Sequence, residues 1–232
     1  MLSAEALRHV FGEGGGQVVA LDGVSFTLTP GQTLAIFGPN GAGKTTLLKV
    51  LAGLIRPREG VVRVAGGRRA IGWIGHQSQL YEHLTVRENL HFWASLYGVP
   101  AARRGPRAAL VLERLGMGDR ADQPVWSLSR GLTQRAAIAK ALIHDPSVLL
   151  LDEPFTGLDL AAAAELRVLL GELRGDTGGR VVVLTTHNVD EGVELATDVA
   201  FQRRGRFVHF APRAGRGPAE IAAAYRRAVT DG

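Results

Sequence analysis

The chain of 232 residues contains no cysteine and no long apolar run. Without cysteine it cannot form a disulfide scaffold, a zinc finger or a thiol-based catalytic site, and a reducing cytoplasm is compatible with the composition. No segment approaches the roughly 18 consecutive apolar residues that a membrane-spanning helix requires. Residues 1–11 also lack the charged and then apolar pattern of a signal peptide, so we expect a chain that is not exported.

What the chain does have is a globular composition and an excess of positive charge. Hydrophobic residues make up 46% and charged residues 21%, which allows one compact domain with a buried core. The net charge is +5, and much of the excess lies near the end in Arg203, Arg204, Arg206, Arg213, Arg216, Arg226 and Arg227. Such an excess fits nucleic acid, an anionic membrane face, phosphate ligands or a solvated arginine-rich tail. Charge alone does not choose among these.

The order of elements predicts an α/β fold. Short β runs separated by turns at 21–23 and 30–31 are expected at residues 18–21, 25–28 and 33–37, with more at 61–64 and 71–75. Apolar residues at helical spacing from 85 to 115, broken at 98–100 and 104–106, predict an inserted group of helices. Helices at 132–144, 160–173, 190–196 and 218–228 then alternate with strands at 148–151, 181–184 and 199–201. This alternation implies a mostly parallel sheet with helices on both faces.

A glycine-rich loop follows the strand expected at 33–37. Its residues are Gly38, Pro39, Asn40, Gly41, Ala42, Gly43, Lys44 and Thr45, followed by Thr46, and they match the pattern G-x-x-x-x-G-K-[ST]. Glycines let successive backbone N–H groups point at phosphate oxygens, and the helix behind the loop adds its positive N-terminus. Lys44 can place its charge on the β- and γ-phosphates of ATP, and the Thr45 hydroxyl can ligate Mg²⁺. A strand in front and a helix behind favour this interpretation over a glycine loop without a ligand.

Two adjacent acids end the apolar strand expected at 148–151. At the carboxyl end of a central strand, Asp152 emerges where open α/β sheets bind ligands, and it is suited to hold Mg²⁺ through water. Successive side chains of a strand point in opposite directions, so we expect Glu153 to face away from Asp152, where it can polarise an attacking water. The alternative, a solvated acidic strand end, loses weight because the phosphate loop precedes it.

Further segments resemble the ABC ATPases. Residues 126–132, Trp-Ser-Leu-Ser-Arg-Gly-Leu, are similar to the ABC signature, usually Leu-Ser-Gly-Gly-Gln; Ser129 and Gly131 are kept, whereas Arg130 and Leu132 depart. Gln77 stands where that family has its Q-loop glutamine. Residues 156–159 resemble the D-loop, and residues 185–187 match the segment that ends in the switch histidine. The resemblance covers residues 2–210.

The resemblance implies a role for each of these residues. Ser129 and Gly131 would cover the γ-phosphate of the opposite subunit, and Asp159 would lie at the dimer interface, so an ATP-dependent homodimer is implied. Gln77 would sense Mg²⁺ and the attacking water, and His187 would contact the γ-phosphate beside the catalytic Glu153. Phe11 sits where the family has an aromatic residue that stacks on adenine, although a lone Phe is also common in a core. The other histidines, His9, His76, His83, His91, His144 and His209, lack the spaced pairing of a metal site.

The family also implies a fold and its boundaries. We expect a phosphate-loop NTPase core with a mostly parallel sheet, a small antiparallel β subdomain and an inserted α-helical subdomain. The ATP-binding domain would span residues 1–210, with the helical subdomain at about 77–134, and residues 211–232 would form a basic tail with a possible short helix.

A bare ATP-binding domain needs a separate integral membrane subunit to drive transport. We expect it on the inner face of the cell membrane, with that subunit docked near residues 77–89 through Leu80, Tyr81, Leu84 and Phe92, unless these side chains pack the helical subdomain. Residues 71–92, with Gly-His-Gln at 75–77 and Glu-Asn-Leu at 88–90, most resemble the ATPase of the haem exporter of cytochrome c maturation.

Three alternatives differ in class. The chain can serve another small bacterial exporter for a drug, lipid or polysaccharide. An ABC ATPase acting on nucleic acid usually carries zinc modules, coiled coils or two fused ATPase domains, which are absent here, so no nucleic acid partner is expected. A non-hydrolysing regulatory subunit would lack Glu153 or His187, and both are present.

Overall fold

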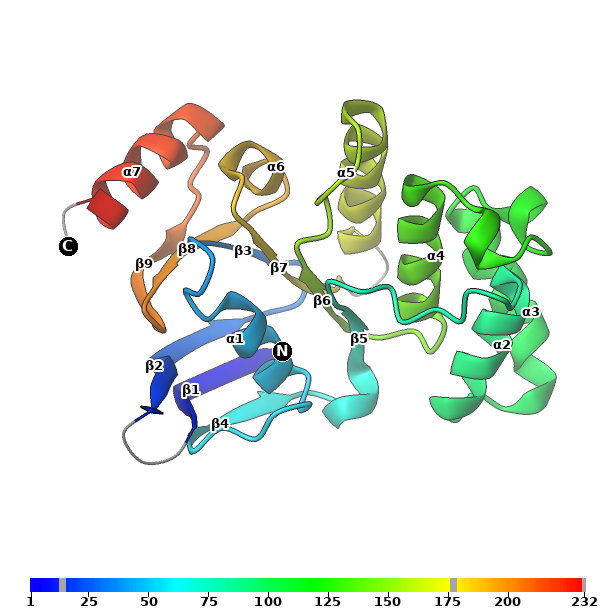
Figure 1. Ribbon diagram of the computed structural model, residues 1–232, viewed down its shortest axis with the longest axis horizontal. Coiled ribbons are helices and arrows are strands. Elements are labelled where there is room, and N and C mark those ends of the chain that lie inside the picture. The colour runs from blue at the N-terminus through cyan, green and yellow to red at the C-terminus, as the bar shows by residue number, and fades with distance from the viewer. Residues whose placement is uncertain (13–15, 176–178, 231–232) are drawn as a thin grey trace.

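The larger of two β-sheets forms the centre of the molecule. The computed structural model describes residues 1–12, 16–175 and 179–230. The six strands of this sheet are β5 (Ile71–Ile74), β6 (Val148–Asp152), β7 (Val181–Thr186), β3 (Thr33–Phe37), β8 (Asp198–Arg203) and β9 (Arg206–Pro212), in that order (Figure 1). The first five are parallel, and β9 pairs antiparallel with β8. The predicted mostly parallel sheet is confirmed.

A small antiparallel sheet lies beside it. It contains β2 (Val18–Leu28), β1 (Leu2–Phe11) and β4 (Glu59–Val64), in that order. The sequence analysis missed β1, and its turn at 21–23 is wrong because β2 continues through it. The pairing slips between Ala4 and Leu7, and again beside Gly23, whose φ is 75°. Such bulges interrupt the alternation of apolar and polar residues, so the sequence of β1 does not show the pattern of a strand. For the same reason Asp22-Gly23 resembles a turn although it lies within β2.

Alternate side chains of the central strands enter two different hydrophobic clusters. Leu34, Ile36, Leu150 and Val183 pack in the cluster shared with the small sheet and α1 (Lys44–Leu51). The residues between them, such as Ala35, Phe37, Leu149, Leu151, Val182 and Leu184, pack in the cluster beneath the other helices. Burial on both faces explains why these strands are apolar throughout.

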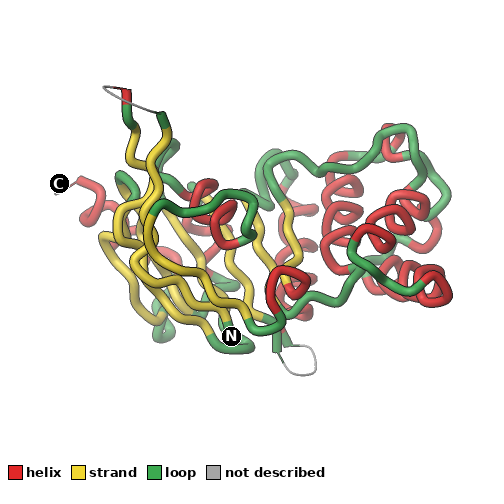
Figure 2. The backbone as a smooth tube through the Cα atoms, turned by 90° about the horizontal axis from the view of Figure 1, so that it is seen from below, coloured by secondary structure: helices red, strands yellow, loops and turns green. Residues whose placement is uncertain are grey.

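The helices cover the sheet and form a separate group at one end. Beyond α1 they are α2 (Val86–Leu96), α3 (Ala101–Arg114), α4 (Arg130–Leu142), α5 (Leu160–Arg174), α6 (Val189–Val193) and α7 (Pro218–Thr230). Helices α2 and α3 lie with α4 beyond β5, away from the small sheet, and Figure 2 shows strands gathered at one end and helices at the other. Helix α4 continues to Leu142, beyond residue 134, where the helical subdomain was expected to end. The predicted inserted helical subdomain is thus present, and the predicted fold class is confirmed.

The first inserted helices show which sequence signals held. Thr85 caps α2: its side chain accepts from the Glu88 N–H, and the Glu88 carboxylate accepts from the Thr85 N–H. The predicted break at 98–100 separates α2 from α3, but the break predicted at 104–106 is wrong. Pro106 lies inside α3, at a cost of roughly 3 kcal/mol for an interior proline. Burial of Val111 and Leu112 on the apolar face of α3 opposes that cost.

The C-terminal part adds an edge strand and a helix. Strand β8 is longer than predicted, and it turns through Arg204 and Gly205, both with positive φ, into β9, which the sequence analysis missed. The side chains of this edge strand are exposed or half-buried, and its apolar residues Phe207, Val208 and Phe210 do not alternate with polar ones, so the two-residue period is absent. Helix α7 contains the short helix predicted at 218–228 and buries Ile221. Within the ranges described, no helix is long and apolar enough to cross a membrane.

Candidate functional site

The phosphate loop connects β3 to α1 and is clamped by its neighbours. Gly43 has φ 102°, and a Cβ there would lie 2.1 Å from the backbone oxygen of Ala20. A Cβ at Gly38 would lie 2.4 Å from the backbone oxygen of Gln202. Only glycine fits at these two positions, because β2 and β8 approach the loop from both sides. The loop geometry therefore depends on both sheets.

Lys44 is the first residue of α1, and its ammonium turns back over the loop. The side chain is 6% exposed, and Nζ donates to the carbonyl oxygens of Gly38 at 2.7 Å and Pro39 at 3.3 Å. It also lies 3.4 Å from Oε1 of Glu153. The lysine thus connects the loop to the acid that follows β6.

Asp152 is a buried carboxylate held by hydroxyl groups. It is 2% exposed, and its Oδ1 accepts hydrogen bonds from Oγ1 of Thr45 at 3.2 Å and of Thr185 at 2.7 Å. Among the described residues it forms no ion pair. A buried acid without a cationic side chain, beside a second hard oxygen ligand on Thr45, fits Mg²⁺ as its counter-ion. The structure thus brings together two of the three predicted metal ligands, Thr45 and Asp152.

Glu153 does not face away from this site, contrary to expectation. Strand β6 ends at Asp152, and Glu153 adopts a left-handed backbone with φ 51°, so strand alternation no longer applies. Its N–H donates to the carbonyl and hydroxyl oxygens of Thr185, both at 3.1 Å. Its Oε2 lies 2.8 Å from Nδ1 of His187. The strained backbone turns the carboxylate back towards Lys44 and the histidine.

The segment after β5 approaches the two acids. Gly75, His76 and Ser78 line a hollow of about 170 Å³ together with Asp152, Glu153, Thr156 and, from α4, Arg130, Thr133 and Gln134. Gln77 belongs to the same segment, but its side chain is exposed and is not among the lining residues. The structure therefore brings the glutamine segment to the site without placing the predicted side chain against Asp152.

Ser129, Gly131 and Asp159 do not line the hollow of the two acids, although Arg130, between Ser129 and Gly131, does. Ser129 caps α4, and Asp159 caps α5 by accepting from the Ala162 N–H at 2.8 Å. Ser129 and Gly131 line another hollow, of about 190 Å³, with Leu158, Ala162 and Glu165. Ser129 is exposed, so its hydroxyl and the start of α4 are accessible to a second molecule.

The remaining predicted residues lie at the end of β1 and in the phosphate loop with the start of α1. Phe11 ends β1 with 44% of its surface exposed, and its ring lies edge to face against His9, with 4.7 Å between the ring centroids. In the loop, Pro39, Asn40, Gly41 and Thr45 are exposed, Ala42 is buried and Thr46 is half-buried. No group of three or more His, Asp or Glu side chains in the described ranges could hold a metal ion by itself.

Sequence reasoning missed two side chains that organise the site. Thr185 bonds Asp152 and the Glu153 backbone, and Gln134 donates to the carbonyl oxygen of Pro154 at 3.0 Å. The Thr-Thr-His run at 185–187 carried the signal for Thr185, but only its histidine was given a role. A polar residue inside a helix gives no comparable signal for Gln134.

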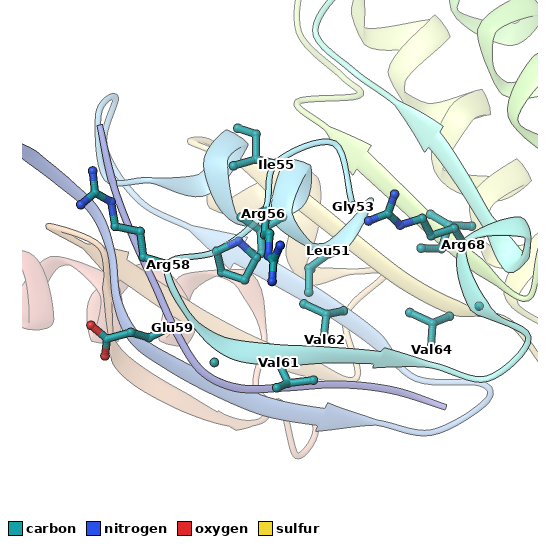
Figure 3. A pocket seen from close by; sticks show the side chains of 15 residues that line it. Leu51, Gly53, Ile55, Arg56, Arg58, Glu59, Val61, Val62, Val64 and Arg68 are labelled. Carbon is teal, nitrogen blue, oxygen red and sulfur yellow. The ribbon is translucent and has the colours of Figure 1, made fainter. Parts of the chain in front are cut away.

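A larger cleft lies away from all these residues. Figure 3 shows Arg56 and Arg68 above the apolar side chains of Leu51, Val62 and Val64, between α1 and β4. Its volume is about 400 Å³. It contains none of the predicted catalytic or metal-binding residues, so size alone does not identify the site.

Comparisons with known proteins agree with the chemistry of the smaller site. Residues 21–156 match the family model described as ABC transporter. The chain is 35% identical over 207 residues to the taurine import ATP-binding protein TauB of Ruegeria pomeroyi, covering 87% of this chain and 74% of that protein. It is 37% identical over 219 residues to the Nod factor export ATP-binding protein I of Ralstonia nicotianae, covering 89% and 65%.

Solved structures show the same fold. A dimeric post-hydrolysis state of the ATP-binding cassette MJ0796 bound to ADP and Pi superposes with a TM-score of 0.82 and 26% identity, covering 91% of this chain and 98% of the other. CbiO1 from Clostridium perfringens, part of the ABC transporter complex cbiONQ, gives a TM-score of 0.80 and 28% identity, covering 96% and 90%.

Proposed function

Because this chain belongs to the ABC transporter family and is an ATPase subunit, we propose that its ATP site is centred on Lys44, Thr45, Asp152 and Glu153. The observation that supports this most is the contact network at the carboxyl ends of β6 and β7. The ammonium of Lys44 lies beside the carboxylate of Glu153, and the Thr45 hydroxyl donates to Asp152. The Thr185 hydroxyl donates to Asp152 and accepts from the backbone N–H of Glu153.

Each residue has a role that follows from its surroundings. The phosphate loop and Lys44 bind the phosphates of ATP, since backbone N–H groups and a buried ammonium favour anions. Thr45 and Asp152 hold Mg²⁺, which supplies positive charge against the phosphate oxygens when it is bound. Glu153 orients and deprotonates the attacking water, and His187, 2.8 Å away, fixes the position of that carboxylate.

The active form in this proposal is a dimer that shares its two ATP molecules. Ser129 and Gly131 line the hollow beside the start of α5 and not the hollow that contains the acids of their own chain, and Ser129 is exposed. A serine hydroxyl and free N–H groups at a helix start suit the γ-phosphate held by a second copy. The similar cassette MJ0796, whose solved structure is a dimer bound to ADP and Pi, supports this arrangement. In the proposed site Phe11 stacks on the adenine ring, Gln77 contacts the attacking water, and Asp159 lies at the dimer interface.

Transport requires a membrane subunit, which we place against the start of the helical subdomain. Tyr81 and Phe92 are 51% and 37% exposed, and their rings meet edge to face at 4.9 Å. Asn89 is fully buried and bonds the backbone of Tyr81 and Leu84, so the surface is held rigid. Leu80 and Leu84 are half-buried beside it. This arrangement puts the ATPase on the inner face of the membrane, where ATP is present.

Haem export is our proposal for the cargo. It rests on the resemblance of residues 71–92 and of Leu128-Ser129-Arg130-Gly131 to the haem-exporter ATPases. The relatives named above are an import protein for taurine and an export protein for Nod factor, so they do not favour haem. Deleting the gene and measuring covalently bound haem in c-type cytochromes tests this cargo. Normal cytochrome c levels would exclude haem export and leave the ATPase proposal intact.

The ATPase site itself is tested on the purified protein. Hydrolysis of ATP should require Mg²⁺ and should be lost together with the Glu153 carboxylate, while ATP binding is retained. Hydrolysis that persists in Glu153→Gln at the wild-type rate would refute the site.

A further inference from the structure

Lys140 is a buried lysine that takes no part in the site described above. It lies on α4, is 1% exposed and forms no ion pair with any carboxylate in the described ranges. Its Nζ donates to the carbonyl oxygen of Ser78 at 2.9 Å and to Oε1 of Gln79 at 3.2 Å. The ammonium also lies 5.0 Å from the ring centre of Trp93 on α2.

A lysine buried in this way makes the free energy of folding less favourable. Removing an ammonium from water without an opposite charge destabilises it, and burial lowers the pKa of Lys140 to about 8. Two neutral oxygens and an aromatic face are its only partners among the described residues. A methionine of similar length would avoid the desolvation cost, so packing alone does not explain a lysine here.

The two oxygens belong to the segment that carries Gln77. Ser78 and Gln79 follow Gln77 directly, and Gln79 has a left-handed backbone with φ 55°. The segment has no regular secondary structure, and the side chain of Gln77 is exposed. The bonds from Lys140 therefore hold this segment at two points, the carbonyl of Ser78 and the side chain of Gln79.

Helix α4 makes further contacts with the proposed catalytic residues. Ser129 caps its start, and Gln134 donates to the carbonyl oxygen of Pro154, next to Glu153. Lys140 lies near its other end. A single rigid helix thus contacts the segment after Glu153 and the segment of Gln77, and it carries Ser129.

We propose that Lys140 is a positioning residue that fixes Gln77 relative to Glu153 and Ser129 by holding the backbone carbonyl of Ser78 and the side chain of Gln79. The inference rests on the proposed function, because it acts through Gln77. It assigns the end of α4 a role in hydrolysis although Lys140 touches neither nucleotide nor metal.

The test combines Lys140→Met with Gln77→Ala in full-length protein and measures ATP hydrolysis and ATP affinity. Lys140→Met should lower kcat about tenfold, within the range by which remote positions modulate a site, and leave the Kd for ATP within about twofold. Lys140→Arg keeps a cation that can reach both oxygens, so it should recover most of the rate. In the Gln77→Ala background, Lys140→Met should cause no further loss, because residues that act as a unit are not additive.

Controls separate positioning from folding. Lys49→Met removes an exposed lysine and should leave kcat unchanged. If Lys140→Met does not fold, Gln79→Asn replaces it: asparagine tolerates the left-handed backbone but is too short to reach Lys140, and a smaller loss of kcat is expected.

The outcomes are distinguishable. A folded Lys140→Met with wild-type kcat, or losses that multiply with those of Gln77→Ala, would overturn the inference and leave the proposed function standing. Wild-type hydrolysis in Gln77→Ala would instead refute the role of Gln77 in the proposed function, and the Lys140 inference with it.

Discussion

The ammonium of Lys44 lies 3.4 Å from the carboxylate of Glu153, and both side chains are largely buried. One residue begins the helix behind the phosphate loop, and the other follows a strand of the central sheet. The contact connects the group proposed to bind phosphate with the group proposed to activate water. A change at either residue therefore affects the electrostatic surroundings of the other.

Lys44→Ala should abolish ATP hydrolysis. It removes the buried cation aimed at the β- and γ-phosphates and leaves Glu153 without its lysine partner. Equilibrium binding of a fluorescent ATP analogue and phosphate release are the measurements, with Lys49→Ala on the same helix as the control. Full activity in Lys44→Ala would mean that the phosphate loop is misassigned.

Gly43→Ala should disrupt the loop without altering any functional side chain. The new Cβ would meet the carbonyl oxygen of Ala20 at 2.1 Å, and the φ of 102° is unfavourable for alanine. We expect lower thermal stability together with loss of ATP binding. Gly41→Ala is the matched control, because its φ is also positive but a Cβ there meets nothing within 4 Å. Equal effects of the two changes would contradict the argument from close approach.

The sequence indicated the candidate site residues by clearer patterns than it indicated the surrounding strands. Lys44 and Thr45 follow from a local pattern, since a strand, a glycine loop and a helix place them by short-range geometry, whereas Asp152 was inferred from the end of a separate apolar strand. Strand β1 was missed because the register slip after Ala4 removes the two-residue period. A backbone irregularity of this kind is determined by the pairing with neighbouring strands, so it cannot be predicted from residue spacing alone.

The direction of Glu153 shows the same limit inside the site. Strand alternation predicted that it points away from Asp152, whereas its left-handed backbone turns it towards Lys44. The bonds from its N–H to Thr185 come from a neighbouring strand, β7, which is distant in sequence. Long-range contacts of this kind determine the direction of the Glu153 side chain, and they cannot be inferred from the spacing of residues in a single sequence.

Tyr81→Glu should uncouple transport from ATP hydrolysis. A charge at this exposed ring would oppose burial against an apolar surface of the membrane subunit, while the ATP site is unaffected. Hydrolysis by the isolated subunit should be normal, and co-purification with the membrane subunit should fail. Val168→Glu on α5, which replaces a side chain that is 64% exposed, is the control and should co-purify. Normal transport by Tyr81→Glu would refute docking at this surface.

The final prediction concerns Glu153 and the shared ATP. Glu153→Gln keeps the size of the side chain and one hydrogen-bonding oxygen but loses the charge, so hydrolysis should fall by roughly 10²- to 10⁴-fold, the usual contribution of a general base. Lys44, Thr45 and Asp152 are untouched, so ATP should still bind. Light scattering should then detect a dimer with ATP but not with ADP, because unconsumed ATP joins the loop of one copy to Ser129 of the other.

Adding Ser129→Asp should return the Glu153→Gln protein to a monomer. Aspartate preserves the N-cap of α4, so the helix stays intact, but its carboxylate would repel the γ-phosphate of the partner's ATP. Ser147→Asp introduces the same charge at an exposed position just before β6 and should leave the dimer unchanged. A dimer that forms without nucleotide, or that survives Ser129→Asp, would exclude an ATP molecule shared through Ser129. Normal hydrolysis by Glu153→Gln alone would exclude the catalytic role and not the dimer, so the two halves of the mechanism fail separately.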